Sequence, residues 1–258
     1  MPFVFNRFKQ DSLDALVFNL LKSANIVKST YIKHETVIPI PITKIVKTFK
    51  IDIIKTPDLM KKNNGIEGIC HPYRKIINVD KHQFDNDILK GRFTLAHEFA
   101  HFILHSYIAL YSYEGDKNKW TPERHREYLN SEVDLPQLIK EVGFDKVPKT
   151  IKAQADDLAG SLLMPQWTFI REYRRLLAEP ENRDEILEEE KPIHILKYSL
   201  SDIFQVSPDV AEIRFGNIQY KDDFEKAVEY EQKISSEEPT QLILEIIRDF
   251  NKLLALKI

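Results

Sequence analysis

Three residues, His97, Glu98 and His101, have the spacing H-E-x-x-H within the segment GRFTLAHEFAHFILH at 91–105. In a helix of about 3.6 residues per turn, positions 97 and 101 lie on one face, one turn apart, so two imidazoles can bind the same cation. The glutamate lies at the edge of that face, where its carboxylate can take a proton from a water molecule without binding the metal itself. The pattern is typical of zinc peptidases, and it predicts His97 and His101 as zinc ligands and Glu98 as the general base.

The residues around this motif predict a buried helix at 92–105. Apolar side chains recur on both sides of the motif, and neither proline nor glycine interrupts the segment. Two histidines and a glutamate inside a buried helix cost free energy unless they are paired or bind a metal, which favours a metal site over a chance match. His105, one turn further on, is interpreted as a histidine that supports the site or packs in the core, not as a ligand.

A second segment is expected to complete the site, because a catalytic zinc ion usually has three protein ligands and one water. The segment TIKAQADDLAGSLLMP at 150–165 has apolar residues at helical spacing, Thr150 as a possible cap and Pro165 at its end. It is therefore predicted to form a helix that packs against the helix at 92–105.

The chain resembles the ImmA/IrrE family of zinc metallopeptidases. The resemblance lies in the runs RFTLAHEFAHFILH and AQADDLAGSLLMP, with IPIPITKIVKTFKIDII before them and IFQVSPDVAEIR after them, over residues 36–216. It implies a zincin-like core with His97 and His101 as zinc ligands and Glu98 as general base. It also implies a role in bacteria and their phages or mobile elements, where the peptidase cleaves a helix-turn-helix transcriptional repressor and so derepresses stress or mobile-element genes.

The second helix departs from the family pattern E-x-x-A-(N/D)-x-F-A-x-x-L-L-M-P, whose first glutamate is the third zinc ligand. Lys152 occupies that position here, whereas Asp156 keeps the position whose side chain supports a histidine. An ammonium group repels a nearby dication, and a lysine can ligate zinc only when it is neutral. Three explanations stay open. Asp156 becomes the third metal ligand, or an acidic residue of the 106–150 segment, such as Glu132 or Asp134, takes the place of the family's ligand glutamate. Otherwise the site is degenerate and Zn2+ binding is weak or absent.

The predicted fold class is α+β, with a zincin-like metallopeptidase core in which a small β-sheet packs on the active-site helix, and additional helices at both ends. The predicted segments are an N-terminal helical extension at 1–30, the core at 31–165, a helical C-terminal part of the core at 166–220, and a C-terminal helical extension at 221–258.

Sequence periodicity also places individual elements. A helix is predicted at 7–25 with Asp11 or Ser12 as its cap. Two short helices are predicted at 196–216, joined at Val206 and Ser207, with Ser207 as the cap and Pro208 in the first turn of the second helix. Runs of β-branched residues predict three strands, at 51–54, 66–70 and 75–79.

The segment at 106–150 is polar and is predicted to be a long irregular insertion with one short helix at 121–129. Gly91 is predicted to open the turn that leads into the helix of the H-E-x-x-H motif.

Composition limits the classes of partner. The chain has 258 residues, a formal net charge of -3 and a pI near 6.3, so no direct nucleic-acid or membrane partner is expected. Its one cysteine, Cys70, excludes a disulfide within the chain and fits a reducing compartment. The start lacks the order of a signal peptide and no apolar run approaches membrane-spanning length, so a cytoplasmic location is expected. The oligomeric state does not follow from the sequence.

The leading functional hypothesis is a zinc-dependent endopeptidase of narrow specificity. Its protein substrate would be a helix-turn-helix repressor encoded elsewhere, because no helix-turn-helix segment is apparent in this chain. The alternative is a catalytically degenerate family member that binds a regulator without cleaving it, and Lys152 favours that alternative. A third hypothesis is a metal-responsive structural protein that uses the histidine pair alone.

Overall fold

The structure is a computed structural model that describes residues 9–29, 34–115, 134–141, 143, 149–179, 193–218, 224–236 and 241–255. These residues form two compact units, which are described separately: the first contains the described parts of 43–159 and 240–258, and the second those of 9–42 and 160–239. The four-segment division predicted from the sequence follows chain order and stays a prediction. Within the described residues, no helix combines the length and the apolar content needed to cross a membrane.

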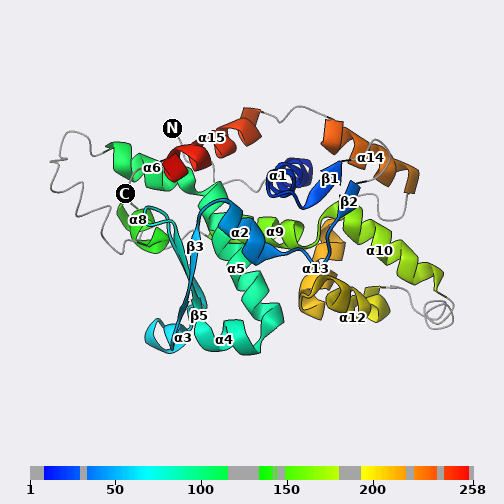
Figure 1. Cartoon of the computed structure of the whole chain (residues 1–258), viewed down its shortest axis with the longest axis horizontal. Helices are drawn as coiled ribbons and strands as arrows, with labels where there is room; N and C mark the ends of the chain where they lie inside the picture. Colours follow the sequence, from blue (N-terminus) through cyan, green and yellow to red (C-terminus); the bar gives the residue numbers. More distant parts are fainter. Residues whose placement is uncertain are drawn as a thin grey trace. The chain divides into compact units, whose positions relative to one another are not determined.

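The first unit contains a mixed three-stranded sheet. Its strands are β3 (Asp52–Thr56), β4 (Gly68–His71) and β5 (Ile76–Asp80), and the strand order is β3-β5-β4. The central strand β5 pairs parallel with β3, beside it in Figure 1, and antiparallel with β4. The paired residues Cys70 and Ile77 are buried on one face of the sheet, the face that packs on a helix. The three strands predicted from the sequence are confirmed, each with bounds shifted by one or two residues.

Helix α5 (Ile88–Leu104) carries the H-E-x-x-H motif and packs against β4 and β5. The Asp87 carboxylate caps it by accepting a hydrogen bond from a backbone N–H of the first turn at 3.1 Å. Gly91 therefore lies inside the helix, and the predicted turn at this glycine is wrong. A Cβ at Gly91 would lie 2.8 Å from the Cα of Phe84 in α4 (Lys81–Asn86), so the glycine is needed for close approach of two helices.

The expectation of an irregular insertion at 106–150 is wrong for its described parts. Residues Ser106–Gly115 form α6 and Leu135–Glu141 form α8. The Tyr73 hydroxyl donates a hydrogen bond to the Ala109 carbonyl at 2.5 Å, which links α6 to the β4–β5 hairpin. Tertiary contacts of this kind override a weak local helix pattern. The short helix predicted at 121–129 lies outside the described residues.

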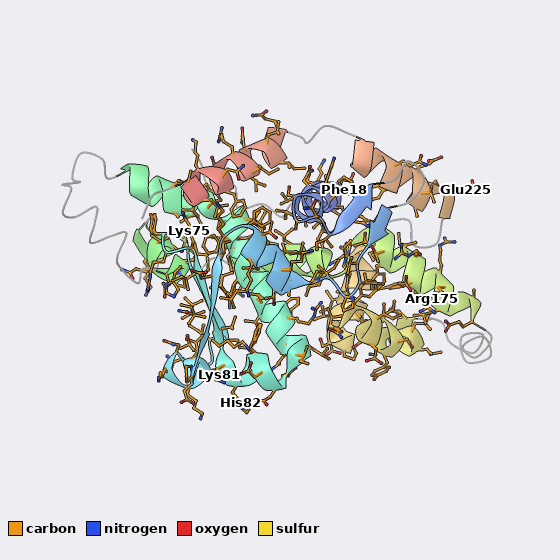
Figure 2. The ribbon with its side chains drawn as sticks, viewed as in Figure 1. Phe18, Lys75, Lys81, His82, Arg175 and Glu225 are labelled. Carbon is orange, nitrogen blue, oxygen red and sulfur yellow. The ribbon has the colours of Figure 1, made fainter. Side chains whose placement is uncertain are left out.

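Three aromatic residues join separate helices of this unit. Phe49 follows α2 (Ile42–Thr48), and its ring centroid lies 5.7 Å from that of Phe99 in α5. Its centroid also lies 5.3 Å from that of Phe250 in α15 (Gln241–Ala255). Such ring pairs add favourable packing beyond their buried area. Lys75, labelled in Figure 2, donates a hydrogen bond to the Leu254 carbonyl at 2.6 Å, near the C-terminal end of α15.

Helix α9 (Lys149–Leu163) confirms the predicted second helix. It begins one residue before Thr150, so this threonine lies in the first turn and is not its cap. The apolar positions Ile151, Ala155 and Leu158 are buried, as the helical spacing predicted.

The second unit is mainly helical. Its elements are α1 (Gln10–Ser23), β1 (Val27–Ser29), β2 (His34–Thr36), α10 (Gln166–Ala178), α12 (Ile193–Phe204), α13 (Pro208–Asn217) and α14 (Phe224–Ser236). Phe18 of α1, labelled in Figure 2, meets the ring of Trp167 in α10 edge on, with centroids 5.9 Å apart. Ser207 caps α13 and Pro208 follows it, which confirms the predicted pair.

Helix α1 begins at Gln10, with Lys9 as its N-cap residue and no side-chain cap. Both predicted caps, Asp11 and Ser12, lie within the first turn, so that prediction is wrong. Asp14 of the next turn is buried and pairs with Arg214 at 3.2 Å within this unit.

Candidate metal and catalytic site

His97 and His101 converge at one point. One helical turn separates them on α5, and their Nε2 atoms are 3.0 Å apart, with ring centroids at 4.7 Å. His101 is buried, whereas the side chain of His97 is 17% exposed. The two imidazoles thus meet at a place that solvent can reach from the His97 side.

Glu98 lies on the buried side of the same helix. Its side chain is 8% exposed, and burial raises the pKa of its carboxyl to about 7, although His97, Lys152 and the Cys70 backbone N–H act in the opposite direction. The negative charge of Asp134 adds to the rise. A carboxylate with a pKa near neutrality can both accept and return a proton, as a general base must.

The backbone of β4 surrounds the Glu98 side chain. The Cys70 amide hydrogen bonds to its carboxylate, and a Cβ built on Gly68 would lie 2.7 Å from the Glu98 Cγ and 2.8 Å from the Thr94 Cγ2. Only a glycine leaves room for the base at this point. Gly68 was not predicted as a site residue, although a glycine within a predicted strand is a signal of close backbone approach.

We expect Gly68→Ala to destabilise the fold by about 1–3 kcal/mol, because the added methyl overpacks against the stem of Glu98. Chemical denaturation would measure this change. Gly160→Ala is the matched control, because its Cβ would meet no atom within 4 Å and alanine favours a helix. Equal stability of Gly68→Ala and wild type would show that β4 does not confine the glutamate.

Asp156 of α9 holds the outer nitrogen of His97. The His97 Nδ1 and Asp156 Oδ1 atoms are 2.8 Å apart. Burial would lower the pKa of His97, but this hydrogen bond and the charges of Glu98 and Asp156 outweigh it and raise the pKa above the ordinary value of 6.5. In this arrangement Asp156 lies behind the ring, on the nitrogen away from His101.

Asp156, His97 and His101 form a row of polar contacts, and His105 and Gln154 continue this row on the other side of His101. The Nδ1 atoms of His101 and His105 are 2.9 Å apart, and the His105 Nε2 is 3.0 Å from the Gln154 Oε1. Burial lowers the pKa of His105 to about 4 and lowers that of His101 well below its ordinary value, so both rings are neutral at neutral pH. Gln154 was not predicted as a site residue, although a glutamine in the apolar stripe of a helix is a signal of a buried polar contact.

Two further groups act on the site through their charge. Lys152 is exposed, and its charge lowers the pKa values of His97, Glu98 and His101. Asp134 precedes α8 and raises the pKa of Glu98. Glu132 lies outside the described residues. Among the residues that the structure describes, no group of three or more His, Cys, Asp or Glu side chains is placed to hold a metal ion.

Comparison with protein-family models decides the family. The Peptidase M78 model, described as the IrrE N-terminal-like domain, matches residues 46–215, which is more than half of the chain. The chain belongs to the Peptidase M78 family. The resemblance to ImmA/IrrE proteins is thereby confirmed, and the α+β arrangement is that of a zincin-like, metallopeptidase-type M78 domain. Comparison with curated proteins and with solved structures found no match.

M78 peptidases are generally metal-dependent, so the donor set of this member can be tested against a cation. Four contacts join Asp156, His97, His101, His105 and Gln154 in a row. Above the raised pKa of His97 all three imidazoles are neutral, and together they carry only three N–H groups. The carboxylate and the amide oxygen at the two ends only accept, so each outer contact takes one proton. The third proton serves only one of the two inner contacts. A cation between the Nε2 atoms of the first two histidines would satisfy the remaining one, so the row fits a metal ion there, while Lys152 stands in place of a third ligand.

Proposed function

We propose that this protein is a zinc-dependent endopeptidase of narrow specificity that cleaves a helix-turn-helix transcriptional repressor and so derepresses the genes under its control. Membership of a metallopeptidase-type family supports the peptidase class. The observation that carries the proposal is the 3.0 Å approach of the Nε2 atoms of His97 and His101 beside the buried Glu98 carboxyl, whose pKa burial raises to about 7. The repressor substrate and the bacterial, phage or mobile-element setting belong to the proposal and rest on the family resemblance. A cytoplasmic location also belongs to the proposal, and the single cysteine fits it.

Each site residue has a separate task in this proposal. His97 and His101 would hold the zinc ion, which when bound supplies a Lewis acid for peptide hydrolysis. Asp156 keeps the His97 proton on Nδ1 and so leaves its Nε2 lone pair available. Glu98 takes the proton of the attacking water and returns it to the leaving amine. The Cys70 amide holds that carboxylate in place.

A second function, binding a regulator without cleavage, is favoured by one observation. Lys152 occupies the family's third-ligand position and places a positive charge within electrostatic range of His97, Glu98 and His101. That charge opposes metal binding. A domain with this site could sequester its target and leave the peptide bond intact.

One experiment separates the two functions. The full chain, loaded with zinc, is incubated with purified helix-turn-helix repressors encoded in the same genome, and the products are weighed by intact mass spectrometry. Two fragments whose masses add up to one repressor plus one water support the peptidase. An uncleaved repressor that co-elutes with the chain on size exclusion supports the binding function and contradicts the peptidase. Absence of both cleavage and complex contradicts the repressor as target.

A further inference from the structure

We propose that His105, held by Gln154, is a positioning residue that sets the tautomer of His101 and so keeps the His101 Nε2 lone pair turned toward the metal position. This inference rests on the metal site of the proposed function, and it concerns how the apoprotein prepares that site.

Gln154 determines which ring nitrogen of His105 carries the proton. Its amide oxygen accepts from His105 Nε2 at 3.0 Å, so the neutral His105 ring carries its proton there and has a lone pair on Nδ1. That lone pair faces His101 Nδ1 at 2.9 Å. A proton on His101 Nδ1 completes this contact and leaves His101 Nε2 as an acceptor.

Burial decides which inner contact goes without a proton. The contact between His101 and His105 lies in the interior, because His105 is only 1% exposed and His101 is buried. Two lone pairs facing each other there would be unsatisfied, which costs far more inside a protein than near solvent. The contact between His101 and His97 is partly exposed, and water or a cation can satisfy it. The missing proton is therefore displaced to the pair of Nε2 atoms, where a metal would bind.

The neighbourhood of His105 supports a positioning role over simple packing. Gln154 is itself 2% exposed and occupies the buried stripe of α9, where an apolar residue would pack at least as well. A neutral amide defines the proton position on His105 without adding a charge near the site. Metal-binding histidines generally have their second nitrogen fixed by such an outer partner. His97 has Asp156 in this place, and His101 has His105.

Nitrogen-15 NMR of the ring nitrogens tests the proposal on the metal-free full chain at alkaline pH. We expect His101 in the wild type to carry its proton on Nδ1. In His105→Phe the inner acceptor is gone, so the His101 proton should move to Nε2 and donate to His97. A wild-type His101 protonated on Nε2, or an unchanged tautomer in His105→Phe, would overturn the proposal.

Zinc affinity, measured by competition with a chromophoric chelator, gives the second readout. His105→Phe should bind zinc about 10–100-fold more weakly than the wild type, the usual effect of losing an outer-shell partner. His105→Gln keeps an acceptor and should restore both the Nδ1 tautomer and most of the affinity, which simple loss of core packing would not do. If His105→Gln matched His105→Phe in both readouts, His105 would be a packing residue only.

Tyr107→Phe is the control for a general disturbance of this core, because its ring centroid lies 6.4 Å from that of His105 outside the row. We expect it to change neither readout. If His105→Phe does not fold, the wild-type tautomer and His105→Gln still decide the question. Absence of peptidase activity would contradict the proposed function but not this inference, because both readouts are independent of cleavage.

Discussion

Replacing Glu98 by glutamine should lower repressor cleavage by about 10²–10⁴-fold, the range typical for loss of a positioned general base. The glutamine amide keeps the size of the side chain but cannot take the proton of a water molecule. The zinc content should stay at the wild-type level, because Glu98 is proposed as a base and not as a ligand. Intact mass spectrometry would follow the cleavage, and elemental analysis the zinc.

Glu67→Gln is the matched control for this variant. Its carboxylate contacts the same helix, through Thr94 Oγ1 at 3.3 Å, but it is not part of the histidine row. It should therefore cleave at close to the wild-type rate. Loss of zinc in Glu98→Gln would contradict the assigned role, because it would make Glu98 a metal ligand. Full cleavage activity in Glu98→Gln would contradict the proposed mechanism, because no other residue is proposed as the general base.

Lys152→Glu should convert weak zinc binding into near-stoichiometric binding. The change removes an ammonium charge from the site and supplies the carboxylate that the family has at this position, on a helix already held against α5 through Asp156 and Gln154. We expect the affinity to rise by about 100-fold or more, beyond the effect of an outer-shell partner. After dialysis against a mild chelator, the wild type should retain less than one zinc and the variant close to one.

Lys152→Met separates the two causes of this gain. It removes the repulsion without adding a ligand, so its affinity should lie between those of the wild type and Lys152→Glu. The hypothesis that Lys152 leaves the site without a third zinc ligand would be contradicted if the wild type kept a full zinc equivalent and Lys152→Glu gained none. Asp156→Ala and Asp134→Ala would then be the next variants, since these carboxylates are the described candidates for completing the site.

The local sequence was sufficient to place His97, Glu98 and His101 on one helix, α5. Helical periodicity requires positions 97 and 101 to share a face, and the flanking apolar residues require that helix to be buried. The same reasoning predicted α9 and the three strands, because a buried element needs a repeating apolar pattern. Caps and starts were less accurate, as at Gly91 and Asp11, because packing against other elements determines where a helix begins.

The family pattern in the sequence determined that Lys152 stands where a ligand is expected, but only the tertiary structure decided how the other site residues are used. It places Asp156 on the outer nitrogen of His97, Gln154 behind His105, and the β4 backbone around Glu98. The residues of these pairs are 28–59 positions apart in the chain and lie on different elements, and no local pattern encodes which side chains meet. Hydrogen-bond direction and burial determine the tautomers of the site histidines only after the elements have packed. The proton of each imidazole, and with it the ability of the site to hold a metal, is therefore a property of the folded chain.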